Sequence, residues 1–223
     1  MIKKVLLFLA PFLITTAAVV FYFKLTQKIS AITIPNLPSI SFSDLVKFSR
    51  FSLEKAPSQS LVGTITQISG EVGYESRNAT EVAKINSPVS VQQGESLITG
   101  TDGSLVLIFE KAAEVDLFAD TSLDVIQTLP ADLVFAQTTG SVTYKKLSDI
   151  PVSIRSHHLL IENNGDISVS INKLKPIITL TVNSGSATIA YNNIYNISRL
   201  FSVTMGQTVT FNDDTRRVVV ENN

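Results

Sequence analysis

The sequence contains no cysteine, which excludes disulfide bonds, thiolate catalysis and every sulfur-ligated metal site. Charged residues make up only 17% of the chain, whereas ordinary globular domains have roughly 25%. The formal net charge is −1, so no strong overall field attracts nucleic acid. The chain also lacks a P-loop, a dinucleotide-binding fingerprint and a G-x-S-x-G nucleophile elbow. We therefore expect no nucleic acid partner and no cofactor.

The first 24 residues contain a long apolar run. Val5 to Phe23 are 19 residues without a charge, interrupted only by Pro11, Thr15 and Thr16. At a rise of ~1.5 Å per residue, a helix of this length is about as long as the ~30 Å hydrocarbon core is thick. A cleaved signal peptide is the alternative, but the run is long and no A-x-A site follows it. The pattern favours an uncleaved transmembrane anchor at residues 1–24.

The charges beside this run bear on its orientation. Lys3 and Lys4 precede it and Lys24 and Lys28 follow it, so the positive-inside rule gives only a small bias. A long C-terminal segment is translocated largely regardless of charge. We therefore expect a single-pass protein of the cell membrane, with a cytoplasmic N-terminus and an extracytoplasmic C-terminal domain. From Leu25 on, 15 basic and 19 acidic residues give that part a charge of −4.

Residues 25–60 form a connector. Pro35 and Pro38 stop any helix that continues from the membrane. Ser43 is placed as an N-cap, apolar residues follow at helical spacing, and Pro57 ends the segment. This pattern predicts a short amphipathic helix whose apolar side packs on the domain or the bilayer surface. Docking to a partner helix is the alternative.

Residues 61–223 alternate between short apolar runs and turn residues. Strands at ~8–12-residue spacing with turn signals indicate an all-β sandwich, barrel or solenoid. We predict a multi-stranded antiparallel β-sandwich or β-roll/solenoid-like domain, with no helix of ordinary length. The runs are Leu61–Ile68, Val89–Val91, Leu105–Phe109, Val115–Phe118, Leu123–Ile126, Leu133–Phe135, Val142–Tyr144, Val152–Ile154, Leu159–Ile161, Ile167–Ile171, Ile177–Val182, Ala187–Tyr191, Phe201–Thr204, Thr208–Phe211 and Val218–Val220.

Local patterns refine this prediction. In DISVSINKL, Ile167, Val169 and Ile171 alternate with polar residues, which is typical of a half-buried strand. Asn164-Gly165 just before them predicts a hairpin, and Asn183-Ser184-Gly185 predicts a further turn.

Three glycines are expected to be structural. Gly94, Gly100 and Gly165 lie at predicted turns, where a positive φ is readily adopted by glycine. We expect a β-branched residue to be strained at each of them.

Glycine and strand patterning over most of residues 61–211 resembles the FecR-type domain of bacterial envelope proteins. GTITQISGEV (residues 63–72) matches a G-x-V/I-x-x-x-x-G-x-V opening. QTTGSVTYKK, LTVNSGSATIAY and VTMGQTVTF are similar to the later glycine-led strands of the family. Glu110-Lys111-Ala112-Ala113 departs from the family, which usually has an Asp-Gly-Ser turn there. A second section, v-x-x-G-x-x-l-x-T-G-x-x-x-S-l-x-l, is matched by Val91, Gly94, Leu97, Thr99, Gly100, Ser104, Leu105 and Leu107.

The resemblance implies an envelope β-domain on a membrane stalk. In the signalling members of the family, a cytoplasmic segment before the membrane helix binds a sigma factor. Only Met1 to Lys4 precede the apolar run here, so an anti-sigma role is not carried over.

Few side chains suggest chemistry. His157 and His158 are adjacent in a strand-like stretch, so they point to opposite faces and do not chelate one ion easily. Asp116, Asp120 and Asp124 recur every fourth residue, a spacing that would suit calcium on a helix but not on strands and turns. We assign no catalytic, cofactor-binding or metal-ligating residue.

Two basic doublets are also interpreted as structural. Lys145-Lys146 and Arg216-Arg217 are read as exposed strand-end charges that discourage edge pairing. The alternative for both is contact with an anionic cell-wall polymer.

Three classes of function remain. The first is a non-enzymatic binding or scaffold module of the bacterial envelope, held by its N-terminal helix and bound to another envelope protein or a cell-wall glycan. The second is an extracytoplasmic sensor or regulator of transmembrane signalling. The third, a wall-directed enzyme, is the least favoured because no acid/base constellation converges in the sequence.

Overall fold

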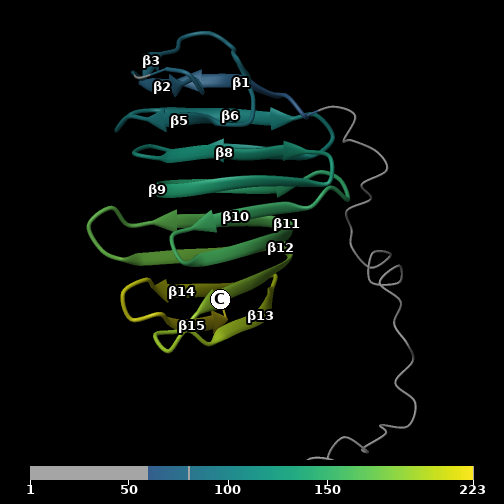
Figure 1. Cartoon of the computed structure of the whole chain (residues 1–223), viewed down its shortest axis with the longest axis vertical. Coiled ribbons are helices and arrows are strands. Elements are labelled where there is room, and N and C mark those ends of the chain that lie inside the picture. The colour runs from purple at the N-terminus through teal and green to yellow at the C-terminus, as the bar shows by residue number, and fades with distance from the viewer. Residues whose placement is uncertain (1–59, 80, 223) are drawn as a thin grey trace, which may run out of the picture. The chain divides into compact units, whose positions relative to one another are not determined.

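The computed structural model describes residues 60–79 and 81–222, shown as the coloured ribbon in Figure 1. These residues form strands, turns and loops without a helix, so the all-β prediction is confirmed for them. The predicted membrane and connector helices lie outside the described residues. The strands are β1 (Gly63–Ser69), β2 (Val72–Glu75), β3 (Ala83–Lys84), β4 (Ser90–Val91), β5 (Glu95–Thr99), β6 (Ser104–Phe109), β7 (Ala113–Leu117), β8 (Ser122–Leu129), β9 (Asp132–Lys146), β10 (Val152–Ser156), β11 (Leu159–Ile171), β12 (Ile177–Asn192), β13 (Ser198–Thr204), β14 (Gln207–Asn212) and β15 (Arg217–Asn222).

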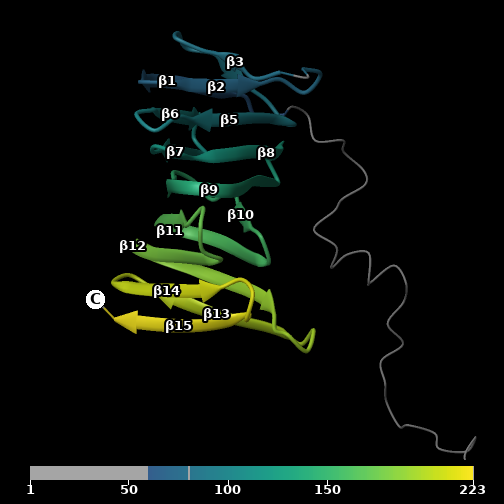
Figure 2. The same cartoon turned by 90° about the vertical axis from the view of Figure 1, so that its left-hand side faces the viewer.

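The strands stack into two layers that share their longest members (Figures 1 and 2). The first layer has the order β4-β1-β6-β7-β9-β11-β12-β14-β15. The second has the order β3-β2-β5-β8-β9-β10-β11-β12-β13. All pairings are antiparallel except β9 with β10, which makes the sheet mixed. The prediction of a purely antiparallel domain therefore needs this one correction.

Strands β9, β11 and β12 belong to both layers. The first half of β9 pairs with β8 and β10, and its second half pairs with β7 and β11. In the same way, β12 pairs with β14 near its start and with β13 near its end. Each long strand therefore turns a corner between the layers, so the two hydrogen-bonded ladders are continuous.

The space between the layers is filled by apolar side chains. Ile167, Val169 and Ile171 are all buried, as their alternation predicts. Phe109 and Phe135 meet edge to face across the two layers, with ring centroids 5.7 Å apart. Burying each such side chain contributes roughly 1.5–3 kcal/mol, so this one contiguous core dominates the stability of the domain.

Glycines occupy the corners. Gly140 and Gly185 have φ values of +82° and +74°, a region that favours glycine. Gly165 of β11 lies opposite Gly185 of β12, and a Cβ on Gly165 would lie 2.1 Å from the carbonyl oxygen of Ser184. Glycine is required there because two backbones approach closely.

The predicted hairpin at Asn164-Gly165 is therefore wrong, and so is the predicted turn at Asn183-Ser184-Gly185. Both segments lie inside long strands, and a bulge follows Asp166. Gly165 was correctly identified as structural, but it does not have the predicted positive φ. Together with Gly185, it lets the two strands cross a corner side by side.

The other two singled-out glycines differ from each other. Gly94 has φ +84°, as predicted. Gly100 does not have a positive φ. Its N–H donates to the Glu71 carbonyl at 2.8 Å, and an added Cβ would crowd the Glu71 side chain at 3.0 Å. Gly100 is therefore constrained by its neighbour, and the predicted turn strain is wrong.

The turn at Glu110–Ala112 is formed even though its residues depart from the family pattern. Lys111 takes a positive φ of 58°, and the N–H of Ala112 donates to the Phe109 carbonyl at 2.9 Å. A lysine is tolerated at a position that glycine usually fills, at the cost of some backbone strain.

Candidate functional site

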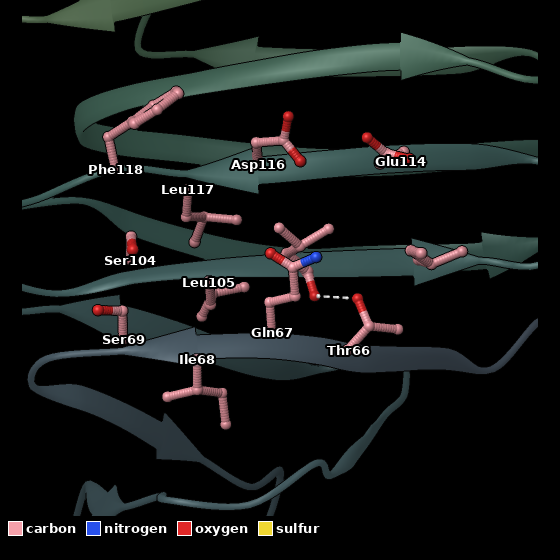
Figure 3. A pocket seen from close by; sticks show the side chains of 12 residues that line it. Thr66, Gln67, Ile68, Ser69, Ser104, Leu105, Glu114, Asp116, Leu117 and Phe118 are labelled. Atoms are coloured by element: carbon pink, nitrogen blue, oxygen red, sulfur yellow. Dashed lines mark hydrogen bonds between the residues drawn. The ribbon is translucent and has the colours of Figure 1, made fainter.

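A shallow groove of about 540 Å³ lies on the outer face of the first layer, over β1, β6 and β7 (Figure 3). A register shift in β1 between Ile65 and Gln67 bends the strand at one wall. Gln67 reaches from β1 over β6, and the Thr66 hydroxyl donates to the Val106 carbonyl at 3.4 Å. Ser69 and Ser104 add hydroxyls at the end of the groove where Phe118 lies.

Two carboxylates of β7 form the opposite wall. Lys145 of β9 donates to both, at 2.5 Å to Glu114 Oε1 and 3.0 Å to Asp116 Oδ2. The hydrogen bonds to Glu114 and then to Asp116 hold the pKa of Lys145 above its ordinary value. The other oxygen of Asp116, Oδ1, is buried and has no hydrogen-bond partner among the described residues. That oxygen is an unsatisfied acceptor within the wall of the groove.

The groove presents side chains that can bind a polar ligand. One lysine binds both carboxylates and so holds them in place along the groove. The amide of Gln67, the hydroxyls and the half-exposed ring of Phe118 can hydrogen-bond and stack on a polar ligand.

Beyond the groove, the outer face of the first layer is covered by hydroxyls that pair with one another. The pairs across adjacent strands are Ser141 with Ser170 at 2.9 Å, Thr143 with Ser168 at 3.0 Å, and Thr181 with Thr208 at 3.2 Å. These cross-strand pairs stabilise the sheet and satisfy its polar surface.

The three aspartates at fourfold spacing do not converge. Asp116 lies on β7, Asp120 in the following turn with φ 53°, and Asp124 on β8. Within residues 60–79 and 81–222, no three histidine or acidic side chains are grouped as a metal site would require.

The histidines were placed wrongly by the sequence pattern. His157 and His158 form the two-residue turn between β10 and β11, and His157 has φ 50°. His158 Nδ1 lies 3.0 Å from Asp213 Oδ1 in the β14–β15 turn. Arg216 donates to the Asp213 carbonyl at 2.7 Å within that same turn, so the His158–Asp213 contact joins two turns.

The lysine doublet ends strand β9, as predicted, but β9 is paired on both sides there, so the predicted role at a sheet edge is wrong. Lys145 is a cation in the middle of the sheet, paired with residues about 30 positions earlier in the chain, and Lys146 donates to Asn164 at 3.2 Å. No local signal in the sequence identifies such partners. Arg217 begins β15, a strand end as predicted.

An apolar surface at the C-terminal end of the second layer was not found from the sequence. Strand β13 pairs with β12 over all seven of its residues, and its other side forms no ladder with a described strand. Leu200 is 73% exposed, and the adjacent loops expose Tyr195 at 76% and Met205 at 67%. Ile194 and Ile197 are exposed as well. We call these five residues with β13 the β13 surface.

In residues 60–79 and 81–222, no helix is long and apolar enough to cross a bilayer.

No protein-family model matches the sequence. No curated protein matches it either. Two crystal structures of a proposed anti-sigma factor from Parabacteroides distasonis ATCC 8503 share the fold, each with a TM-score of 0.50. They are 11% and 10% identical in sequence. Each alignment covers 57% of this chain and 59% of the other, which is less than two thirds of that protein. The β-domain therefore has a fold related to that of these proteins, in keeping with the resemblance found in the sequence.

Proposed function

We propose that this chain is a membrane-anchored module of the bacterial envelope whose β-domain lies outside the cytoplasm and binds another protein without catalysing a reaction. The apolar run at residues 1–24 is the basis for the anchor. The β13 surface is the observation that carries the binding role.

Edge strands of monomeric proteins are usually protected by proline, bulges or several charges. Strand β13 contains no proline, pairs in unbroken register, and has Arg199 as its single charge. Apart from the Thr204 N–H, which donates to Gln207 Oε1 at 2.9 Å, the backbone groups of β13 that face away from β12 can accept a further strand. The exposed Leu200 supplies an apolar contact beside them. An added strand from a partner satisfies both features.

The experiment places a photo-crosslinking amino acid at Ser202 on β13 in the full chain, expressed in its own cells. Ser202 is exposed and is paired to β12 on one side only. We expect one defined protein adduct from Ser202 and none from the same amino acid at Leu174, an exposed position in the β11–β12 loop.

A matched pair of substitutions sharpens the result. Leu200→Lys adds a charge on the edge and is expected to reduce the Ser202 adduct about tenfold, since a desolvated apolar anchor is lost. Leu174→Lys makes the same chemical change away from the edge and leaves the adduct unchanged. An adduct that survives Leu200→Lys contradicts the proposal.

A second function is favoured by the fold relationship. The structural neighbours are described as proposed anti-sigma factors, so a role in transmembrane signalling is the alternative. It predicts that deleting the gene for this chain alters transcription of a defined set of genes, and that Leu200→Lys reproduces the change. A binding module without a regulatory role leaves transcription unaltered.

A further inference from the structure

Two adjoining hollows lie on the outer face of the second layer, where β10, β11, β12 and β13 come together. Their volumes are about 420 and 240 Å³. They share His158, Leu160 and Asn192, so they form one continuous basin. We call this the arginine basin, because three arginines line it.

The arginines come from three different strands or turns. Arg155 lies on β10, Arg199 on β13, and Arg216 in the β14–β15 turn. Neither the Arg155 guanidinium nor that of Arg199 has a hydrogen bond or an ion pair with a described residue. Arg216 is held by the Asp213 carbonyl at 2.7 Å and the Asn192 carbonyl at 3.4 Å. The turn thus fixes one guanidinium while the other two keep all their donors.

Three acidic residues lie near the basin. The Asp213 carboxylate is bound by the ring nitrogen Nδ1 and the backbone N–H of His158. Asp132 and Glu162 lie on the neighbouring strands β9 and β11. Burial raises the pKa of Asp132 and the charge of Arg155 opposes that rise, so Arg155 interacts with Asp132 electrostatically without forming an ion pair. Acidic residues outnumber basic ones between residues 60 and 222, so this gathering of arginines runs against the charge of the domain.

We propose that the arginine basin binds a phosphate group. A guanidinium presents paired donors that match the oxygens of a phosphate, and several of them around one hollow can share its charge. The volume exceeds that of a phosphate alone, which leaves room for an attached group beside Leu160. A phospholipid headgroup and a free or glycan-borne phosphate share this chemistry. The site is separate from strand addition at β13, although Arg199 lies on that strand.

The test uses the full chain in neutral detergent micelles at low ionic strength, titrated by calorimetry. One arm adds sodium phosphate against sodium chloride of equal ionic strength. A second arm adds dihexanoyl phosphatidylglycerol, with dihexanoyl phosphatidylcholine as the zwitterionic control. Saturable binding in either arm is expected. Binding of phosphate alone indicates a soluble or glycan source, and binding of the glycerol lipid alone indicates a headgroup.

Two double variants with the same loss of charge decide whether the basin is responsible. Arg155→Gln with Arg199→Gln is expected to weaken binding at least about tenfold, because hydrogen bonds from charged donors are lost. Lys84→Gln with Lys173→Gln, at two exposed sites elsewhere, is expected to change it less than about twofold. Equal weakening by both, or no saturable binding in either arm, overturns the proposal. The single variant Arg155→Gln, at an exposed side chain without bonds, gives the same answer if the arginine double variant fails to fold.

Discussion

The paired glycines at the corner of β11 and β12 allow two energetic effects to be separated. Gly185 combines a positive φ with crowding, since its Cβ would lie 2.5 Å from the Asn164 carbonyl oxygen. Gly165 has the crowding without the positive φ. Gly206 has φ +82° with nothing within 4 Å. Substituting alanine at each position therefore tests crowding and backbone conformation separately.

The expected losses follow from these geometries. A left-handed conformation costs an ordinary L-residue about 1–2 kcal/mol, which is the whole effect expected for Gly206→Ala. An inserted methyl group in a packed site costs about 1–3 kcal/mol, which applies to Gly165→Ala. Gly185→Ala carries both costs and should lose about 2–5 kcal/mol. The order of stability should be Gly206→Ala, then Gly165→Ala, then Gly185→Ala.

Urea unfolding of residues 61–223, followed by far-UV circular dichroism, measures these losses. With a slope of about 2 kcal/mol/M, the Gly185→Ala midpoint should fall by about 1–2.5 M, and the Gly206→Ala midpoint by about 0.5–1 M. If Gly165→Ala unfolds at the wild-type midpoint, the two backbones do not approach as closely as the structure shows. The corner argument is then refuted.

Four further outcomes are expected. Residues 61–223 expressed alone should be soluble with a strand-dominated circular dichroism spectrum; a helical spectrum would contradict the fold. Lys145→Met should lower the free energy of unfolding by about 1 kcal/mol, a modest loss because Lys145 is only partly buried. Lys146→Met is the control and should lose less. The hydrogen bonds to Glu114 and Asp116 raise the pKa of Lys145 above 10.5. Its contribution to folding stability is therefore complete below pH 10.5 and is lost as the pH rises through the raised pKa. The difference in urea midpoint between wild type and Lys145→Met should shrink over this alkaline range. Gln137→Leu should cost at least about 2 kcal/mol in urea unfolding, because Gln137 accepts from the buried Tyr144 hydroxyl and donates to two backbone carbonyls; a wild-type midpoint would mean that these groups find other partners. Alkaline phosphatase fused behind the last residue should be active in the membrane pellet, whereas activity in the soluble envelope fraction would mean a cleaved signal and inactivity a cytoplasmic domain.

The parts of the fold that depend on local pattern were predictable. Strand periodicity places Ile167, Val169 and Ile171 in the core because side chains alternate along any strand. The hairpin at Asn164-Gly165 failed because glycine suits both a turn and a close approach of two backbones. Only the pairing of Gly165 with Gly185, twenty residues away, separates these roles, and that pairing is not local.

The candidate sites were less predictable for the same reason. In the sequence, Lys145 is only one half of a charged doublet. Its partners Glu114 and Asp116 come from β7, which only the folded structure places beside it. His158 meets Asp213 through the contact of two turns 55 residues apart. The β13 surface depends on which strand ends the layer, and the sequence of a strand does not state its neighbours. Short strands such as β3 carry too few residues to show a period.

The corner-turning strands have a mechanical consequence. The described chain starts beside β8, where the Leu61 N–H donates to the Thr128 carbonyl, and continues into β1 near one end of the stack. The β13 surface lies at the other end (Figure 1). Under the proposed function, tension between the membrane anchor and a partner bound at β13 would run across the strands, along their hydrogen bonds. Because β9, β11 and β12 pass through both layers, neither layer can slide or peel away independently along this part of the stack. Pulling the ends apart must open two ladders at once, so the domain should transmit a load as a stiff spacer and not as an extensible spring.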